Sequence, residues 1–134
     1  MPKPLNPAKL AESGSEHANQ VALFCCASQH FNEYPQLRLM YAIPNGGKRD
    51  KITASNLKAE GVKAGMLDVC LPWPNCGKHG LYIELKVGKH KPTEEQYWYI
   101  AELKKAGFAA EWVIGWELAW QLILCYLKGE YGTF

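Results

Sequence analysis

Residues 81–96 read LYIELKVGKHKPTEEQ, and this stretch decides the fold because it predicts a strand followed by a helix. Residues 81–87 form an apolar run that is typical of a strand. Side chains alternate along a strand, so Glu84 and Lys86 share one face with Tyr82, while the aliphatic residues between them occupy the other face. The strand is therefore predicted to be apolar on one face and charged on the opposite one.

The sequence around this stretch predicts an α/β domain. Thr93 and Gln96 have capping-box spacing for a helix that runs to Lys105 and is closed by Gly107. The order of helices and strands predicts a mixed central β-sheet flanked by helices. The other expected elements are a first helix from Ser13 or Ser15 to about Phe31, strands at 37–43, 66–71 and 109–114, a short helix at 55–60 stopped by Gly61, and a last helix at about 116–127.

The chain has the size and composition of one domain. Its 134 residues are enough to bury one core, and 48% of them are apolar and 21% charged. Residues 1–134 are expected to form one domain, with 1–12 as a flexible lead because proline is concentrated there. The start lacks a signal-peptide pattern, and the longest apolar stretch, LAWQLILCYL, is too short to cross a bilayer. A cytoplasmic protein without a membrane partner is therefore expected.

The five cysteines do not show the spacing of a disulfide framework. An odd number of cysteines without such spacing fits reduced thiols. Cys70, Cys76 and His79 are close in sequence and could contribute to a zinc site, but their spacing is not that of a zinc knuckle and a fourth ligand is not obvious. Reduced thiols are the favoured interpretation.

Basic residues are concentrated in two segments, although the formal net charge is only +2. Residues 45–63 contain five lysines and arginines against two acidic residues, and residues 78–91 contain four lysines against Glu84 alone. A solvated loop is the simplest interpretation of each segment taken by itself.

Asp68 adds a second carboxylate to the charged face. Residues 66–71 and 81–87 are joined by PWPNCGKHG and are expected to form an antiparallel hairpin. Leu67 should join the apolar face together with the aliphatic residues that follow it at alternate positions. Asp68 should then lie beside Glu84 on the opposite face.

Two carboxylates held close together repel each other, and a divalent cation such as Mg²⁺ or Mn²⁺ removes that conflict. Lys86 would then supply positive charge where an attacking water or a pentacovalent phosphate develops negative charge. Together the three groups suit hydrolysis of a phosphodiester, in which the metal polarises the phosphate and lowers the pKa of its bound water. The alternative is an exposed strand face whose charges only keep an edge solvated.

Several stretches of the chain match one family in their order and spacing. They are Glu16 with Gln20, IPNGGKR at 43–49, LKAEGVKAGMLDV at 57–69, GLYIELKVGKHKPTEEQ at 80–96, and the final strand led by Gly107. Together they resemble the virus-type replication-repair nuclease (VRR-NUC) domain, a branch of the PD-(D/E)XK nuclease superfamily. The resemblance implies a restriction-endonuclease-like core with the order α-β-β-β-α-β. One difference is Leu67, which stands where the superfamily pattern has proline before the aspartate.

The resemblance also implies a metal centre that uses Mg²⁺ or Mn²⁺. Asp68, Glu84, Glu16 and the backbone carbonyl of Leu85 would be its ligands, and Lys86 would orient or activate the water. Considered by itself, Glu16 could equally be a helix-start carboxylate stabilised by the helix dipole.

Other matching positions are implied to lie near the site or the DNA. Gln96 would lie near the catalytic groups, which is compatible with its capping-box role. Glycines let the main chain approach a phosphate, and basic residues offset its charge. The implied DNA-binding residues are Asn45, Gly46, Gly47, Lys48, Arg49, Lys63, Lys89 and Lys91.

The expected function is a metal-dependent endonuclease that cuts branched DNA, such as four-way (Holliday) junctions, as a homodimer. This follows from the resemblance to stand-alone phage VRR-NUC proteins, which also implies a bacterial or phage-infected host cell. The last helix is apolar on nearly every side and is expected either to cover the core or to form part of the dimer interface through Trp116 and Trp120.

Two alternatives remain open. A DNA-binding module that no longer cuts would use the same basic segments and aromatic residues. A glycosidase-type carboxylate pair would need neither a metal nor a nearby lysine, so Lys86 counts against it.

Overall fold

The computed structural model describes residues 3–44 and 50–134, and its centre is a sheet with the strand order β1-β2-β3-β4. β1 and β3 run antiparallel to β2, whereas β4 runs parallel to β3. The sheet is therefore mixed, as the sequence predicts. The strands are β1 (Tyr41–Ala42), β2 (Val69–Leu71), β3 (Leu81–Lys86) and β4 (Ala109–Ile114).

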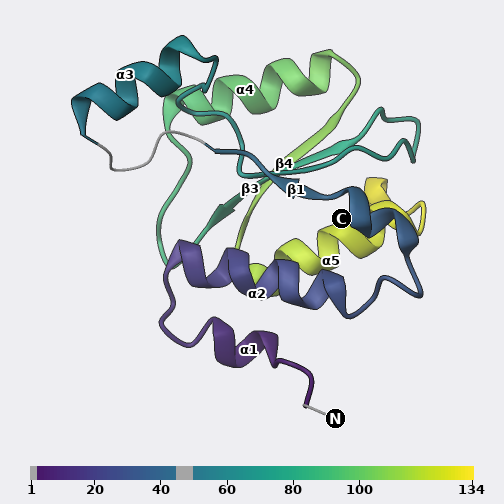
Figure 1. Cartoon of the computed structure of the whole chain (residues 1–134). Coiled ribbons are helices and arrows are strands. Elements are labelled where there is room, and N and C mark those ends of the chain that lie inside the picture. The colour runs from purple at the N-terminus through teal and green to yellow at the C-terminus, as the bar shows by residue number, and fades with distance from the viewer. Residues whose placement is uncertain (1–2, 45–49) are drawn as a thin grey trace.

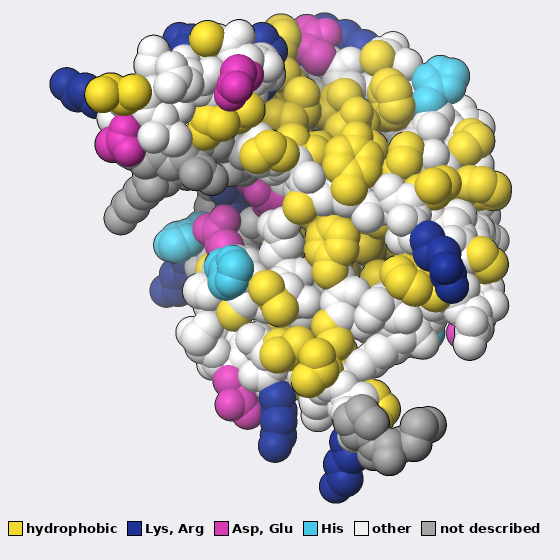
Figure 2. All heavy atoms as spheres, viewed as in Figure 1, with side chains coloured by type: hydrophobic (Ala, Val, Ile, Leu, Met, Phe, Trp, Pro, Cys, Tyr) yellow, Lys and Arg dark blue, Asp and Glu magenta, His cyan; other side chains and the backbone are white. Residues whose placement is uncertain are grey.

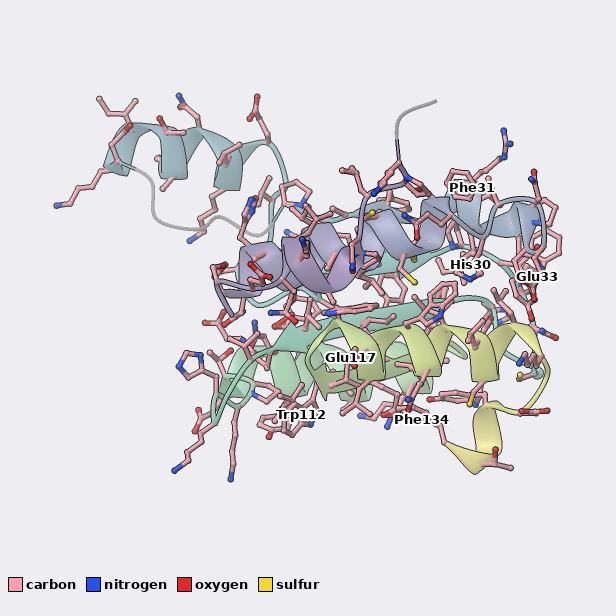
Figure 3. All side chains as sticks on the ribbon, turned by 90° about the horizontal axis from the view of Figure 1, so that it is seen from below. His30, Phe31, Glu33, Trp112, Glu117 and Phe134 are labelled. Atoms are coloured by element: carbon pink, nitrogen blue, oxygen red, sulfur yellow. The ribbon has the colours of Figure 1, made fainter. Side chains whose placement is uncertain are left out.

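Helices cover both faces of this sheet (Figure 1). α2 and α5 pack against each other on one face, where Figure 3 shows them from below, and α4 covers the other face, with α3 lying beside α4. The helices are α1 (Pro7–Leu10), α2 (Glu16–Ser28), α3 (Lys51–Ala59), α4 (Glu94–Lys105) and α5 (Trp116–Leu127), with short 3₁₀ helices η1 (Pro35–Leu39) and η2 (Tyr131–Thr133).

The sheet separates two apolar clusters. The larger lies between the sheet and helices α2 and α5, and it takes the aliphatic side chains of β3. The smaller lies under α4 and has Tyr82 at its border. The alternation predicted for β3 is therefore confirmed, with its polar residues on the α4 side. Fully buried members of the larger cluster include Leu23, Leu71, Leu81, Ile83, Leu122, Ile123 and Tyr126.

Capping residues set the helix ends where the sequence predicts them. Ser15 is the cap of α2, because its hydroxyl accepts a hydrogen bond from the Ala18 N–H at 3.0 Å. Thr93 and Gln96 form the predicted capping box of α4, with bonds of 3.2 Å and 2.9 Å in the two directions. Gly107, just beyond α4, has a φ of +94°, a backbone conformation that glycine adopts readily.

The strand predicted at 37–43 is mostly wrong. Pro35–Leu39 forms the 3₁₀ helix η1, and the strand that follows it has only two residues. Pro35 occupies the first turn of η1, where its fixed φ favours a helical start.

The short helix predicted at 55–60 begins earlier, at Lys51. The Asp50 carboxylate accepts a hydrogen bond from the Thr53 N–H at 2.8 Å and so caps an additional turn. The lead at 1–12 also contains helix, because the Asn6 side chain caps α1, which packs against α2.

Leu67 lies on the opposite side of the sheet from the prediction. It is fully buried, but it belongs to the cluster under α4 rather than to the cluster that holds Val69 and Leu71. The strict alternation of a strand begins only at Val69, because the chain bends at Asp68.

α5 covers the core with one side of its surface. Ala119, Leu122, Ile123 and Tyr126 are completely buried, whereas Leu118 is 44% exposed. Trp116 and Trp120 pack against the larger cluster and are partly buried. No helix within residues 3–44 and 50–134 has the length and apolar character needed to cross a bilayer.

Candidate active site

The hairpin of β2 and β3 brings Asp68 next to Glu84. Val69 pairs with Ile83 across the hairpin, so Asp68, one residue earlier, faces Glu84. The Asp68 N–H donates to the Ile83 carbonyl at 3.0 Å, and its side-chain Oδ2 accepts from the Leu85 N–H at 2.9 Å. The carboxylate thus continues the strand pairing at the point where β2 bends away. Two bonds to β3 fix its position beside Glu84.

Lys86 lies on the same face of β3 as Glu84, so two buried charged side chains stand beside the half-buried Asp68. Its Nζ lies 3.1 Å from Glu84 Oε2, and both side chains are buried, Glu84 almost completely. The other oxygen of Glu84, Oε1, is buried and has no hydrogen-bond partner among the described residues. Buried polar atoms are normally paired, so this oxygen is poised for a ligand.

The pKa of Glu84 is raised to about 8, chiefly because burial disfavours its ionised form and also because the Asp68 carboxylate lies beside it, while Lys86 acts in the opposite direction. Desolvation disfavours a carboxylate, and a second negative charge beside it has the same effect. One nearby ammonium group does not offset both. A second positive charge at this place would therefore be strongly favoured when both acids are ionised.

These residues fit a hard divalent cation. Two carboxylates, one with an unsatisfied buried oxygen, are the donors that Mg²⁺ and Mn²⁺ take from proteins, with water and substrate phosphate supplying the remaining ligands. The carbonyl of Lys86 accepts from the Gly115 N–H on the β4 side. Because successive carbonyls of a strand point to opposite edges, the Leu85 carbonyl is directed to the Asp68 side.

Glu16, the remaining predicted metal ligand, forms an ion pair with a histidine. It is the first residue of α2, and its Oε2 is 3.5 Å from Nδ1 of His90, which sits in the loop after β3. Within residues 3–44 and 50–134, no three His, Cys, Asp or Glu side chains form a group that could hold a metal ion. The structure therefore pairs Glu16 with His90, and its role as a third carboxylate ligand stays a prediction.

Gln96 is buried at the first turn of α4, where its side-chain oxygen accepts a hydrogen bond from the Thr93 N–H in the capping box. The zinc alternative finds no structural support, because Cys70, Cys76 and His79 do not form a ligand cluster in the described part of the chain.

The predicted DNA-binding residues divide into two sets. Lys63, Lys89 and Lys91 are exposed, in the segments that precede β2 and follow β3. Figure 2 shows acidic, basic and histidine side chains gathered in a hollow below α3. The other predicted residues, Asn45, Gly46, Gly47, Lys48 and Arg49, lie outside the residues that the structure describes.

Trp112 borders the site and was missed by the sequence reasoning. In the parallel register of β3 and β4, Trp112 pairs with Glu84. Its ring packs edge-on against the ring of Tyr97, with 6.5 Å between the ring centroids. Alternation along 109–114 gives the face on which Trp112 lies. Its position beside Glu84 depends on the register between β3 and β4. These strands are joined through α4, and no local sequence pattern specifies their register.

The fold and the three charged groups define a class of protein. The chain has a mixed sheet between helices, an aspartate just before one strand of a hairpin, and a Glu-x-Lys sequence on the other strand. This is the core arrangement expected of the PD-(D/E)XK superfamily.

A comparison with solved structures specifies the class further. The chain is similar to a structure described as "VRR_NUC domain protein", with a TM-score of 0.73 and 26% sequence identity over 86% of this chain and 89% of that chain. No protein-family model and no curated protein sequence matches the chain. The resemblance to a VRR-NUC domain and the predicted fold class are thus confirmed, and VRR-NUC domains are nucleases.

Proposed function

We propose that this protein is a metal-dependent DNA endonuclease that hydrolyses phosphodiester bonds. The observation that carries the proposal is the grouping of the half-buried Asp68 with the buried Glu84 and Lys86, in which Glu84 Oε1 has no hydrogen-bond partner among the described residues. A glycosidase-type carboxylate pair needs neither a metal nor a nearby lysine, whereas here Lys86 Nζ lies 3.1 Å from Glu84 Oε2. The similarity to a VRR-NUC domain structure supports the same choice.

Each residue has a role that follows from its position. Mg²⁺ or Mn²⁺ bound at Asp68 and Glu84 supplies Lewis-acid chemistry to the scissile phosphate. The Leu85 N–H holds Asp68 in place, so its carboxylate is oriented before a substrate arrives. Lys86 brings a positive charge to the place where the phosphate becomes more negative during hydrolysis.

The proposed substrate is branched DNA, including four-way junctions, and the proposed assembly is a homodimer. Resolving a four-way junction requires two cuts, and a symmetric dimer holds two sites at a fixed separation. The exposed lysines at 63, 89 and 91 and the basic segment 45–49 are proposed to contact the DNA backbone, and Glu16 and Gln96 to act near the cut.

The test is a cleavage assay on duplex, flap and four-way DNA with Mg²⁺, with Mn²⁺, or with EDTA. We expect cutting only with a divalent ion. Asp68→Asn and Lys86→Ala should each reduce the rate at least about 100-fold, the effect of losing one group that stabilises the transition state. Lys128→Ala, an exposed lysine just beyond α5, is the matched control and should cut normally. Sedimentation of the same samples tests the homodimer.

A DNA-binding module without catalysis is the second candidate. It is favoured by one observation, namely that only two carboxylates meet in the described part of the site. Tight binding of branched DNA by the wild-type protein, with no cutting under any divalent ion, would establish this second function in place of the first.

A further inference from the structure

A second concave site lies between α3 and the first turns of α4. It is a cavity of about 420 Å³, and its lining includes Ala54, Leu57 and Lys58 from α3, Lys63 from the segment that follows, and Glu95 and Tyr99 from α4. Figure 1 shows α3 and α4 next to each other on the same side of the sheet. No buried residue belongs to α3, so this helix contributes a wall of the cavity and not a part of the core.

The interior of the cavity suits a flat heteroaromatic ring. Ala54 and Leu57 supply an aliphatic wall, and Tyr99, which packs on the smaller apolar cluster, supplies an aromatic one. The volume falls in the range of small-molecule pockets, about 300 to 1,000 Å³, which are mostly apolar with a few polar groups. Aromatic side chains bind nucleobases by stacking, whatever the base.

The polar groups at the cavity suit the rest of a nucleotide. Lys58 and Lys63 are exposed cations that can contact the phosphates on either side of a bound base. Glu95 can accept a hydrogen bond from a base amino group. The chain at Gly65 lies directly against it, since a Cβ on Gly65 would be 2.6 Å from the Glu95 Cβ. This contact joins the segment before β2 to the start of α4.

Two residues that line the cavity, Tyr99 and Glu95, are linked to residues of the proposed active site. Tyr99 shares an apolar cluster with Leu67, whose neighbour is Asp68. Glu95, on the other wall, is followed by the buried Gln96 at the start of α4. The cavity is therefore connected to the carboxylates through adjacent residues of the chain on two of its walls.

We propose that this cavity binds one unpaired nucleobase of the DNA strand that is being cut. The inference rests on the proposed function, because it takes DNA as the ligand. It goes further by naming an unpaired base as the part of the DNA that the cavity recognises. A base inside a duplex must first be unstacked and unpaired, whereas a base at a branch or bulge is already free. The cavity thus gives the protein a physical reason to prefer branched over continuous DNA.

The test measures binding in EDTA, so that no cleavage occurs. The probes are a labelled duplex and the same duplex with one bulged 2-aminopurine, whose fluorescence reports its surroundings. The wild-type protein should bind the bulged DNA about tenfold more tightly, an effect of the size expected from stacking one base. Ala54→Phe fills the cavity and should remove this preference together with the change in fluorescence.

Ala59→Phe is the matched control, because Ala59 lies on the same helix, is exposed, and does not line the cavity. It should keep the preference. A second pair provides an independent measurement: Lys58→Glu should weaken binding of the bulged DNA more than Lys51→Glu does, since Lys51 is exposed on α3 outside the cavity. Equal behaviour of Ala54→Phe and Ala59→Phe, or a wild-type protein without the preference, would overturn the proposal.

The outcome is independent of the cleavage test. If the protein never cuts DNA but Ala54→Phe abolishes the preference for the bulge, the endonuclease proposal fails and the base site stands. If the protein cuts DNA and both phenylalanine variants bind alike, the base site fails and the endonuclease stands.

Discussion

Opposing effects act on the ionisation of Glu84. Its position on β3 buries it almost completely, beside a second carboxylate and one ammonium group. In a protein without a metal this arrangement is unfavourable, because desolvation and like charge both oppose ionisation. The cost is consistent with a functional site, where perturbed pKa values concentrate.

Glu84 should make stability depend on pH. Its folded pKa, about 8, lies above the ordinary value of 4.5, so the folded state holds the proton more tightly than the unfolded state. The resulting stabilisation is fully present below about pH 4.5 and is lost as pH rises to about 8. Measured by urea unfolding in EDTA, the free energy of unfolding of wild type minus that of Glu84→Gln should fall across this interval.

Glu102→Gln is the control for this measurement, because Glu102 is a surface residue paired with Lys105 at 3.5 Å. Its difference from wild type should stay nearly constant over the same pH interval. A constant difference for Glu84→Gln as well would show that Glu84 does not titrate with a raised pKa.

The end of α5 and the loop before β3 form one hydrogen-bonded unit. The Tyr126 hydroxyl donates to the Trp73 carbonyl at 2.6 Å and accepts from the Asn75 N–H at 3.1 Å. The Asn75 side chain in turn donates to the carbonyls of Tyr126 and Leu127 at 2.9 and 3.1 Å. These bonds satisfy carbonyls that the helix end leaves free and fix the loop that joins β2 to β3.

Tyr126→Phe should therefore destabilise the protein. Tyr126 is fully buried, and removing its hydroxyl takes the hydrogen-bond partner from two backbone groups in its neighbourhood. The expected loss is roughly 1 to 3 kcal/mol of unfolding free energy in urea titrations. Tyr97→Phe, at a ring that is 45% exposed, is the matched control and should change stability little. Equal effects of the two substitutions would contradict this account of the loop.

The arrangement of all elements places the carboxylates where three segments of the chain meet. β2 supplies the bend that positions Asp68, β3 supplies Glu84 and Lys86, and α4 covers the face on which these side chains lie. α2 and α5 leave this face free, since they pack on the other side of the sheet (Figure 3).

Divalent ions should stabilise the folded protein more strongly at about pH 8 than at about pH 6. At the lower pH a cation must displace the proton that Glu84 holds, whereas at the higher pH Glu84 is already ionised in a large fraction of the molecules. Melting temperatures measured with and without Mg²⁺ at both pH values test this expectation. Asp68→Asn removes one carboxylate and should lose most of the stabilisation. An increase that is the same at both pH values would contradict the role of Glu84.

The sequence by itself determined the features that depend on near neighbours. The capping box of Thr93 and Gln96, the two faces of β3 and the β2–β3 hairpin all follow from spacing within a few residues. The sequence also indicated Asp68, Glu84 and Lys86 as one group, because a short hairpin fixes which residues face each other.

Only the tertiary structure decided the features that depend on distant segments. The bend at Asp68 carries Leu67 under α4, the pairing of β4 sets Trp112 beside Glu84, and the packing of α2 leaves Glu16 next to His90. The burial of Glu84 is also tertiary, since a strand residue becomes buried only when other elements pack around it. Local patterns cannot specify such contacts, because they arise from packing between elements and not from the conformational preferences of single segments.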